Sequence, residues 1–522
     1  MLPIIRLACL SSSLVCLLHA QAQPDTLWTK CLGGSSTDRA FSIQQTNDGG
    51  YIVAGISYSA DGDVYGSHGD EDAWVVKLDA EGYILWTNCL GGIDDDGVGS
   101  IWETSDGGYV VAGLTGSTDG DVNGNHGGYA DAWVVKLDAV GDTLWTKCLG
   151  GSEGDGAASI QQTSDGGYVV AGYTQSTDGD VHGNHGGLYD AWVVKLAAAR
   201  DTLWTKCLGG SQWDHANNIQ QTIDGGYVVA GHSRSTDGDV HGNHGNSDAW
   251  VVKLDAAGDT LWTKCVGGSG NDEARCIQQT SDGGYVVAGH TWSTDGDVNG
   301  NHGSLDAWVM KLDAVGDTLW TKCLGGSNGE GANSILQTND GEYLVAGWTS
   351  SIDGDVHGIQ GGISDVWVVR LDDGGDTLWT KCLGGSQWDL AFAAQQTSAG
   401  GFVLAGWTES TNGDVHGNHS DNGADAWIVK LGMDEVGLSE MESLQFTISP
   451  NPTTNAFTLQ LARTVQALPV SLLDATGRLV QTHQLNTTGP IILDLSGHEN
   501  GLYLVQVRFD DGSTATQRVV KQ

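Results

Sequence analysis

The chain has 522 residues, more than one ordinary hydrophobic core holds. Its 65 Asp and Glu residues against 23 Lys and Arg residues give a formal net charge of -42. Because so acidic a surface repels phosphate backbones and anionic lipid headgroups, the composition argues against nucleic acid as a partner and leaves cations and neutral polymers open.

Residues 1–22 have the features of a secretory signal peptide. Arg6 precedes an apolar centre, and the Ala-Gln-Ala sequence that ends at Ala22 predicts cleavage after that residue. A membrane anchor is the less favoured alternative, because Ser11 to Ser13 interrupt a short apolar run. No later segment is apolar enough to span a bilayer. We therefore expect an exported mature chain with no transmembrane segment.

Residues 23–431 consist of seven copies of one unit. Two phrases, "LW" and "DAWVVKL", each return seven times at a spacing of 58 to 60 residues. The tryptophans of the first phrase are Trp28, Trp86, Trp145, Trp204, Trp262, Trp320 and Trp379. Those of the second are Trp74, Trp133, Trp192, Trp250, Trp308, Trp367 and Trp427. A repeat this regular predicts an array of identical supersecondary units.

Each unit contains four short apolar, β-branched or aromatic runs. In the third unit these are "ASIQQT", "YVVAGYT", "AWVVKL" and "TLWTKCLGG", and the first two are joined by Ser-Asp-Gly-Gly, a sequence that favours a tight hairpin. The runs are too short for helices and show no 3.6-residue stripe. Each unit is therefore predicted to be a four-stranded antiparallel meander.

Stacked four-stranded sheets predict an all-β protein, a seven-bladed β-propeller. Such sheets cannot stay soluble alone, and a ring of blades covers every face. The first "LWTKCLGG" has no preceding partner, and the last "DAWIVKL" has no following one. We therefore expect residues 25–34 to pair with residues 425–431, which closes the ring and removes two exposed sheet edges. In this arrangement the long Gly/Asp loops and the connections between units lie on one face, where ligand binding is expected first.

The long loops contain an Asp-Gly-Asp motif that suggests calcium. In two units the motif continues to Asn and Gly and resembles the first half of an EF-hand-type loop, because alternate carboxylates on a tight turn present oxygen ligands. The candidate calcium ligands are Asp119, Asp121, Asn123, Asp178, Asp180, Asp237, Asp239, Asp295, Asp297 and Asn299. No Glu occupies the twelfth position, and four units have His at the fifth. The alternative is that these aspartates only bond their own backbone as turn formers.

Other residues that could bind metal or form bridges are better explained by packing. The His-Gly-Asn-His sequences, such as His182 to His185, supply two ligands where structural zinc needs four. One Cys per unit sits at the same strand position, and equivalent positions of stacked sheets lie roughly 10 Å apart, beyond the reach of a disulfide. We expect these cysteines to be small buried residues. Cys265 with Cys276 is the one pair worth testing.

Catalytic motifs are missing from the sequence, so whether the protein is an enzyme stays open, with a non-catalytic role favoured. There is no nucleophile elbow, no zinc-protease motif and no phosphate-binding loop. Paired loop-face acids could act in glycoside hydrolysis. Five aromatic residues vary between the units and could stack on sugar rings or pack between blades. They are Trp213, Trp292, Trp348, Trp388 and Trp407.

The C-terminal region has a different character. Residues 432–442 form a short acidic linker, and residues 443–522 contain several alternating strands, which predicts a small β-sandwich. This region resembles the C-terminal sorting domain of type IX secretion cargo. The motifs that carry the resemblance are Ser449-Pro450-Asn451-Pro452, Asp474-Ala475-Thr476-Gly477-Arg478, Gly501-Leu502-Tyr503 and Val519-Val520-Lys521.

The resemblance implies handling by the type IX secretion machinery and passage across the outer membrane of a Gram-negative bacterium. In that family the domain is removed during release or attachment to surface lipopolysaccharide. Residues 25–431 also resemble the propeller-like repeats found ahead of such domains. The leading hypothesis is a secreted or surface-attached binding or adhesion module for a glycan or protein, with calcium as the one cofactor suggested. A polysaccharide hydrolase and a structural spacer are the alternatives.

Overall fold

The computed structural model divides the chain into two compact units, residues 1–435 and 436–522. The described residues are 23–420, 423–433, 446–449, 453–461, 468–474, 478–485, 491–508 and 514–521. The predicted signal peptide and nearly all of the predicted linker lie outside them. Every regular element that the structure describes is a strand, and this part of the chain contains no helix that could cross a membrane.

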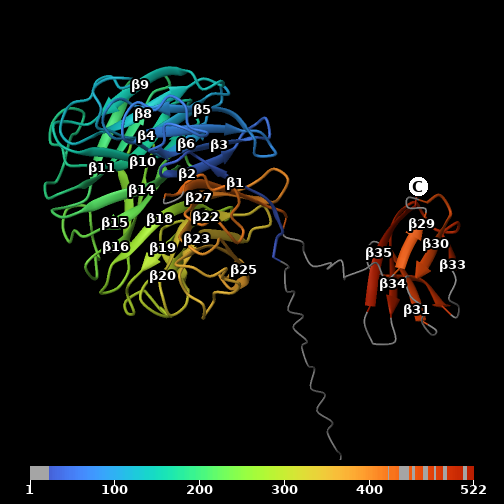
Figure 1. Cartoon of the computed structure of the whole chain (residues 1–522). Coiled ribbons are helices and arrows are strands. Elements are labelled where there is room, and N and C mark those ends of the chain that lie inside the picture. Colours follow the sequence, from blue (N-terminus) through green and yellow to red (C-terminus); the bar gives the residue numbers. More distant parts are fainter. Residues whose placement is uncertain are drawn as a thin grey trace, which may run out of the picture. The chain divides into compact units, whose positions relative to one another are not determined.

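The first unit (Figure 1) contains seven four-stranded sheets, each formed by consecutive antiparallel strands except at the chain ends. The first strands of the sheets are β2 (Asp38–Gln45), β6 (Asp96–Glu103), β10 (Asp155–Gln162), β14 (Asp214–Gln221), β18 (Asp272–Gln279), β22 (Glu330–Gln337) and β26 (Asp389–Gln396). The second strands are β3 (Tyr51–Ser57), β7 (Tyr109–Thr115), β11 (Tyr168–Thr174), β15 (Tyr227–Ser233), β19 (Tyr285–Thr291), β23 (Tyr343–Thr349) and β27 (Phe402–Thr408).

The other two strands of each sheet carry the repeated tryptophans. The third strands are β4 (Asp72–Leu78), β8 (Asp131–Leu137), β12 (Asp190–Leu196), β16 (Asp248–Leu254), β20 (Asp306–Leu312), β24 (Asp365–Leu371) and β28 (Asp425–Leu431). The fourth strands are β5 (Ile84–Leu90), β9 (Thr143–Leu149), β13 (Thr202–Leu208), β17 (Thr260–Val266), β21 (Thr318–Leu324), β25 (Thr377–Leu383) and, for the last sheet, β1 (Thr26–Leu32). The predicted four-stranded antiparallel units are confirmed.

Burial explains why the central strands are so apolar. Every residue of the third strand β16 is buried, whereas the fourth strand β17 begins with two exposed residues. A strand buried on both faces is uniformly apolar, and an edge strand is not. The hairpins have the predicted turn chemistry: Gly166 has a φ of 81°, and its N–H donates to the carbonyl of Thr163 at 2.9 Å.

The hydrophobic cores lie between neighbouring sheets. One core joins Val193 and Leu208 of one sheet to Ile219, Tyr227 and Trp250 of the next. Another joins Ala405 and Ile428 of the last sheet to Ile43, Tyr51 and Trp74 of the first. Because no sheet has a core of its own, each is stabilised only by its neighbours.

The two ends of the repeat lie side by side. Strand β1 pairs antiparallel with β28, with Thr29 opposite Val429 and Leu32 opposite Ala426, as the sequence predicts for these segments. In Figure 1 the blue N-terminal strand accordingly lies beside the orange end of the unit. The first strand of the first sheet, β2, also contacts β26 and β27 of the last.

The second unit contains two sheets that share one core. The sheets are β29 (Phe446–Ser449), β30 (Ala456–Leu461) and β33 (Ile491–Asp494), and β32 (Leu479–Leu485), β31 (Leu468–Asp474), β34 (Gly501–Arg508) and β35 (Thr514–Lys521). Phe457 and Leu493 from the first sheet pack with Leu472, Val505 and Val519 from the second.

Candidate functional site

The Asp-Gly-Asp motifs fasten the long loops to the connections between sheets. Asp237 Oδ1 accepts a hydrogen bond from the N–H of Ser211 at 2.8 Å, and Asp239 Oδ2 accepts one from the N–H of Gly209 at 3.3 Å. The N–H of Asp239 donates in turn to the carbonyl of Gly209 at 2.8 Å. In every sheet the first residue of the motif accepts a backbone N–H group of the preceding connection. In the seventh sheet this first residue is Asn412.

The predicted calcium ligands are distributed over four such loops. Asp119, Asp178 and Asp295 accept backbone N–H groups at 2.7 to 3.0 Å, and so does Asp237. Like Asp239, Asp121 and Asp297 accept hydrogen bonds from glycine N–H groups, at 3.2 to 3.4 Å. Oδ2 of Asp180 instead lies 3.7 Å from Nε2 of His126. Asn123 and Asn299 are exposed. Among the described residues, no group of three or more His, Cys, Asp or Glu side chains is placed to hold a metal ion. The calcium assignment stays a prediction.

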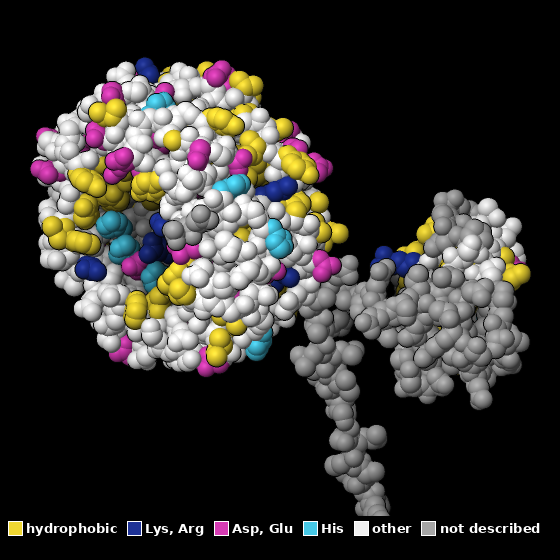
Figure 2. All heavy atoms as spheres, in the orientation of Figure 1, with side chains coloured by type: hydrophobic (Ala, Val, Ile, Leu, Met, Phe, Trp, Pro, Cys, Tyr) yellow, Lys and Arg dark blue, Asp and Glu magenta, His cyan; other side chains and the backbone are white. Residues whose placement is uncertain are grey.

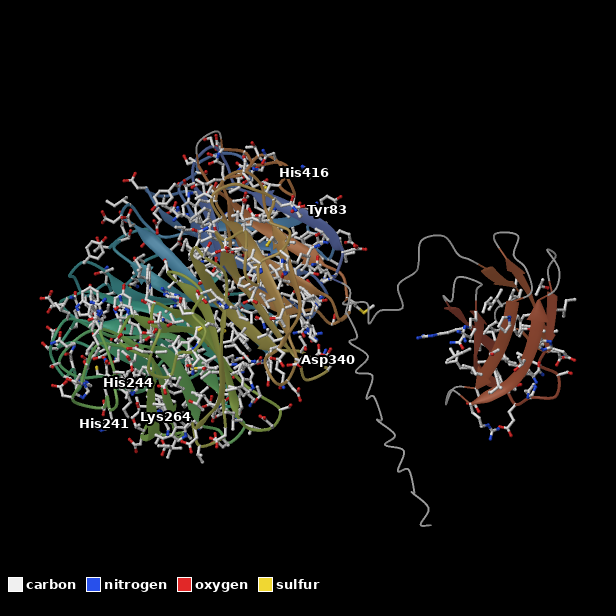
Figure 3. The ribbon with its side chains drawn as sticks, turned by 90° about the horizontal axis from the view of Figure 1, so that it is seen from below. Tyr83, His241, His244, Lys264, Asp340 and His416 are labelled. Atoms are coloured by element: carbon white, nitrogen blue, oxygen red, sulfur yellow. The ribbon has the colours of Figure 1, made fainter. Side chains whose placement is uncertain are left out.

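In five of the long loops, one histidine binds a buried aspartate of its own sheet. Nδ1 of His244 lies 2.7 Å from Oδ2 of Asp248, and four other loops repeat this pair at 2.6 to 2.7 Å. In Figure 3 His241 and His244 of one loop lie on the opposite side of the unit from His416 of another. The histidines of different loops are therefore spread around the unit rather than gathered at one centre.

Two rows of fully buried carboxylates were not singled out from the sequence. Each first strand begins with an acid, such as Asp214, which accepts hydrogen bonds from Gly210 N–H at 2.8 Å and from the hydroxyls of Ser233 and Ser235. Each third strand also begins with an aspartate, such as Asp248, whose Oδ1 is buried without a hydrogen-bond partner. Burial raises the pKa of Asp214 and of Asp248. The sequence does contain a signal for these buried acids, because an acidic residue recurs at the same strand boundary in every unit.

The eight cysteines among the described residues are buried or half-buried free thiols. Cys265 and Cys276 are among them, so the structure does not form the one disulfide that the sequence left open. Burial raises the pKa of Cys265 to about 12, which keeps it in the thiol form.

Nine residues that depart from the repeat lie at one end of the third, fourth and fifth sheets. We call them the non-repeated cluster. Its members are Tyr173, Tyr189, Trp213, His215, His232, Arg234, Glu273, Arg275 and His290. They lie where the first strands begin and the second strands end: His215 is opposite His232, and Glu273 is opposite His290. The face shown in Figure 2 is hollowed near its centre, and histidine, basic and acidic side chains gather in the hollow.

Aromatic rings line one side of this cluster. The rings of His215 and His232 are stacked with centroids 5.0 Å apart, and Tyr173 lies 4.9 Å from His215. Tyr189 meets Trp213 edge to face at 5.5 Å, and the Arg234 guanidinium lies 5.1 Å above the Trp213 ring. Such contacts orient the rings and leave polar edges available to a ligand.

The other side of the cluster is charged. Oε2 of Glu273 lies 2.7 Å from Arg275 and 3.5 Å from Nε2 of His290. Burial lowers the pKa of His215 and of His290 to about 4, so both rings are neutral at pH 7. Burial alone would raise the pKa of Glu273, but its electrostatic interactions with His232, Arg275 and His290 lower it overall.

Three buried polar atoms in or beside the cluster lack a hydrogen-bond partner among the described residues. Nε2 of His215 and Nδ1 of His232 are buried without a hydrogen-bond partner, and so is Oδ1 of the neighbouring Asn271. Buried polar atoms are usually paired, so three unpaired ones in one place indicate a site for an additional partner.

From the sequence alone, Trp213 and Trp292 were singled out as possible ligand contacts, but the histidines and Glu273 were not. Comparing the seven units position by position would have shown that the start of the first strand varies most.

The first strands surround a central cavity of about 450 Å³, lined by Trp102, Gln161, Asn218, Gln220 and Cys276 among others. An open depression of about 640 Å³ lies between the first and last sheets, where Arg39, Tyr58 and His419 contribute to its wall. Arg39 lies 4.9 Å above the ring of Trp407. Both hollows are less rich in aromatic rings than the non-repeated cluster.

These observations define the first unit as an all-β protein of seven blade-like sheets. Residues 447–522 match the secretion system C-terminal sorting domain. The second unit is thus a type IX sorting domain, and the protein is secreted or attached to the outer surface of a Gram-negative bacterium.

A curated relative is the regulatory protein FlaEY of Caulobacter vibrioides, 25% identical over 404 residues. The match covers 69% of this chain and 42% of that protein, so the chain spans less than half of the relative's length. Solved structures with similarity include BBS1N in complex with ARL6DN (9% identity, TM-score 0.40, 79% of this chain and 97% of that one). Another is puromycin hydrolase, with 11% identity and a TM-score of 0.41. That match covers 86% of this chain and 62% of the other. TM-scores below 0.5 carry no argument about function.

Proposed function

We propose that the protein is a type IX cargo whose first unit is a non-catalytic binding module, a closed seven-bladed β-propeller that binds its ligand at the non-repeated cluster. The pairing of β1 with β28 and the core shared by the last and first sheets support the closed ring. The core shared by the two sheets of the second unit supports a β-sandwich for the sorting domain.

The observation that carries this proposal is a local loss of repetition. Selection for the fold alone would keep the seven units alike, and at most positions they are. At the start of the first strands the fourth unit instead carries Trp213 and His215, and the fifth unit carries Glu273 and Arg275. Concentrated chemical variety at the loop end of a rigid scaffold is the usual arrangement of a binding surface.

The chemistry of the cluster favours a surface glycan as the ligand. Flat sugar faces stack on aromatic rings, and their hydroxyls pair with neutral imidazole nitrogens, carboxylates and guanidinium groups. Trp213 and Tyr189 supply rings, whereas His215, Glu273 and Arg275 supply donors and acceptors. Trp292, which is 50% exposed, adds another aromatic surface at the end of β19.

Binding of the full mature chain to an array of bacterial and host-surface glycans tests the proposal. We expect a selective signal that Trp213→Ala and Glu273→Gln each weaken at least tenfold. Tyr83→Ala is the matched control, because this ring is 63% exposed and belongs to the turn between β4 and β5, away from the cluster. A signal that both cluster variants retain would contradict the site. Release of sugar from the bound glycan, lost in Glu273→Gln, would support a hydrolase instead, and a blank array would favour a spacer.

A further inference from the structure

A three-donor arrangement recurs at the turn between the first and second strands. In the first sheet, Asp48 Oδ1 accepts hydrogen bonds from Thr46 Oγ1 at 2.5 Å, Gly50 N–H at 2.9 Å and Lys77 Nζ at 3.0 Å. Oδ2 of the same carboxylate lies 2.9 Å from Lys77 Nζ. The turn and the lysine thus form a niche for one carboxylate group.

Five further sheets repeat this niche. The second to fifth sheets bring a lysine to within 3.1 Å of the aspartate, and the sixth uses Arg370 with Asp340 (Figure 3) at 2.7 Å. The pairs of the second to fifth sheets are Lys136 with Asp106, Lys195 with Asp165, Lys253 with Asp224, and Lys311 with Asp282. The lysines are 3 to 4% exposed, so each depends on its aspartate for a counter-charge.

The seventh sheet keeps the donor residues of the niche in its sequence but lacks the acceptor. Ala399 stands where the other sheets have aspartate, while Thr397, Gly401 and Lys430 occupy the donor positions. The Thr397 hydroxyl now donates to the carbonyl of Gly401 at 3.2 Å. Lys430 is 7% exposed, and its Nζ lies 5.5 Å from the centroid of the Tyr51 ring. Within the described residues the structure gives Lys430 no acidic partner, and burial lowers its pKa to about 8.

A ligand could reach this niche from solvent. In the six sheets that carry the aspartate, its side chain is 55 to 61% exposed, so the carboxylate position lies at the surface. The basic group lies just beneath it. The change to Ala399 removes the carboxylate and leaves residue 399 exposed. The side chain of Met433, itself 62% exposed, lies beside the next residue, Gly400, whereas nothing lies beside the equivalent glycines of the other sheets.

We propose that Thr397, Gly401 and Lys430 form a binding site for the carboxylate group of a small organic anion, at the turn that Ala399 opens. The anion would accept hydrogen bonds from the same donors as Asp48 and supply the counter-charge that Lys430 otherwise lacks. A planar carboxylate suits the niche better than a halide, because both oxygens of Asp48 contact Lys77. This site is separate from the non-repeated cluster and does not depend on it.

Formate is the direct probe, since it supplies the carboxylate by which aspartate differs from alanine. The titration of Lys430 is followed by NMR in the full mature chain labelled at lysine Cε, with sodium formate against sodium chloride at equal ionic strength. We expect formate to raise the pKa of Lys430 from about 8 by at least one unit. Ala399→Asp should raise this pKa without formate and remove the response.

A matched variant reproduces the niche elsewhere. Asp224→Ala leaves Thr222, Gly226 and Lys253 in the arrangement of the seventh sheet, so Lys253 should become sensitive to formate as Lys430 is. If Asp224→Ala does not fold, the comparison of the wild-type chain with Ala399→Asp still tests whether formate binds beside Lys430. Identical titration of Lys430 in formate and chloride would overturn the proposal, and so would an equal formate response in Ala399→Asp.

Discussion

Nδ1 of His419 lies 2.6 Å from Oδ2 of Asp425, a fully buried carboxylate at the start of β28. The equivalent carboxylate of the preceding sheet, Asp365, has no histidine and accepts only the N–H of Gln360, at 2.6 Å. Burial raises the pKa of both groups, to about 6 for Asp425 and to about 7 for Asp365. The histidine thus accounts for part of the difference between two otherwise equivalent sites.

Asp365→Asn is therefore expected to stabilise the protein at pH 8. A carboxyl group whose pKa is higher in the folded state than in the unfolded state contributes stability that is complete below about pH 4. That contribution is lost as the pH rises through the folded-state pKa of about 7. The amide cannot ionise, so in urea unfolding the variant should gain on the order of 4 kcal/mol at pH 8 and almost nothing at pH 4.

The same substitution at the histidine-bearing site is the control. Asp425→Asn gives up the contact with His419, so its gain at pH 8 should be clearly smaller. Equal gains for the two variants would show that the histidine does not influence the ionisation of its aspartate.

The regular part of the fold followed from the sequence because its signals are local and repeated. A run such as Ala191 to Leu196 between glycine-rich turns predicts the same strand seven times, and the unmatched phrases at the two ends predicted the pairing of β1 with β28. Predicting this pairing needs only the count of strands, and counting is reliable when the units are this similar.

The residues of the proposed binding site were harder to predict, because their signal is a departure from the repeat. His215 and Glu273 lie at the same position of consecutive units but have different chemistry, so no motif contains them both. Their partners, His232 and His290, come from the neighbouring strands and are set by register. Asp248 was missed for another reason: next to a loop rich in Gly and Asn, an aspartate is typical of a turn, and only the structure shows that it is buried.

The last long loop supplies a natural test of the Asp-Gly-Asp motif. Asn412 accepts the N–H of Ser386 at 2.9 Å, as Asp119 accepts that of Ile93 at 3.0 Å. Because an amide oxygen is enough, Asp119→Asn should leave the thermal midpoint without metal unchanged, whereas Asp119→Ala should lower it. Equal loss in the two variants would show that the charge, rather than the acceptor, is required.

Calcium binding by Asp119, Asp121 and Asn123 is a separate prediction from the sequence. A site at one hundred times its dissociation constant stabilises the folded state by about 2.7 kcal/mol. We expect calcium to raise the thermal midpoint relative to excess chelator, and Asp121→Asn to reduce the increase. The same midpoint in calcium and chelator would leave these aspartates as backbone acceptors alone.

Strand β1 should be essential for a soluble protein. Its removal exposes the edge of β28, with the N–H and C=O groups around Val429 unpaired. We expect a chain that lacks residues 23–33 to unfold at a lower temperature and to self-associate in light scattering, and a peptide of residues 24–34 to reverse both effects. Deletion of residues 23–24 alone keeps all of β1 and is the control.

Arg200 is the one non-glycine with a positive φ, 71°, among the described residues. It lies in the turn between β12 and β13, where the next sheet has Gly258 with a φ of 82°. A left-handed conformation costs a side chain about 1–2 kcal/mol, and the greater freedom of glycine in the unfolded chain offsets part of that.

Arg200→Gly should therefore stabilise the protein by about 0.5–1 kcal/mol. Gly258→Arg should destabilise it by at least as much, because a Cβ there would lie 2.9 Å from the Trp204 ring. Urea unfolding of both variants measures the change in the free energy of unfolding, which should be positive for Arg200→Gly and negative for Gly258→Arg. A loss of stability in Arg200→Gly would mean that the arginine side chain makes a favourable contact that outweighs the strain of its backbone.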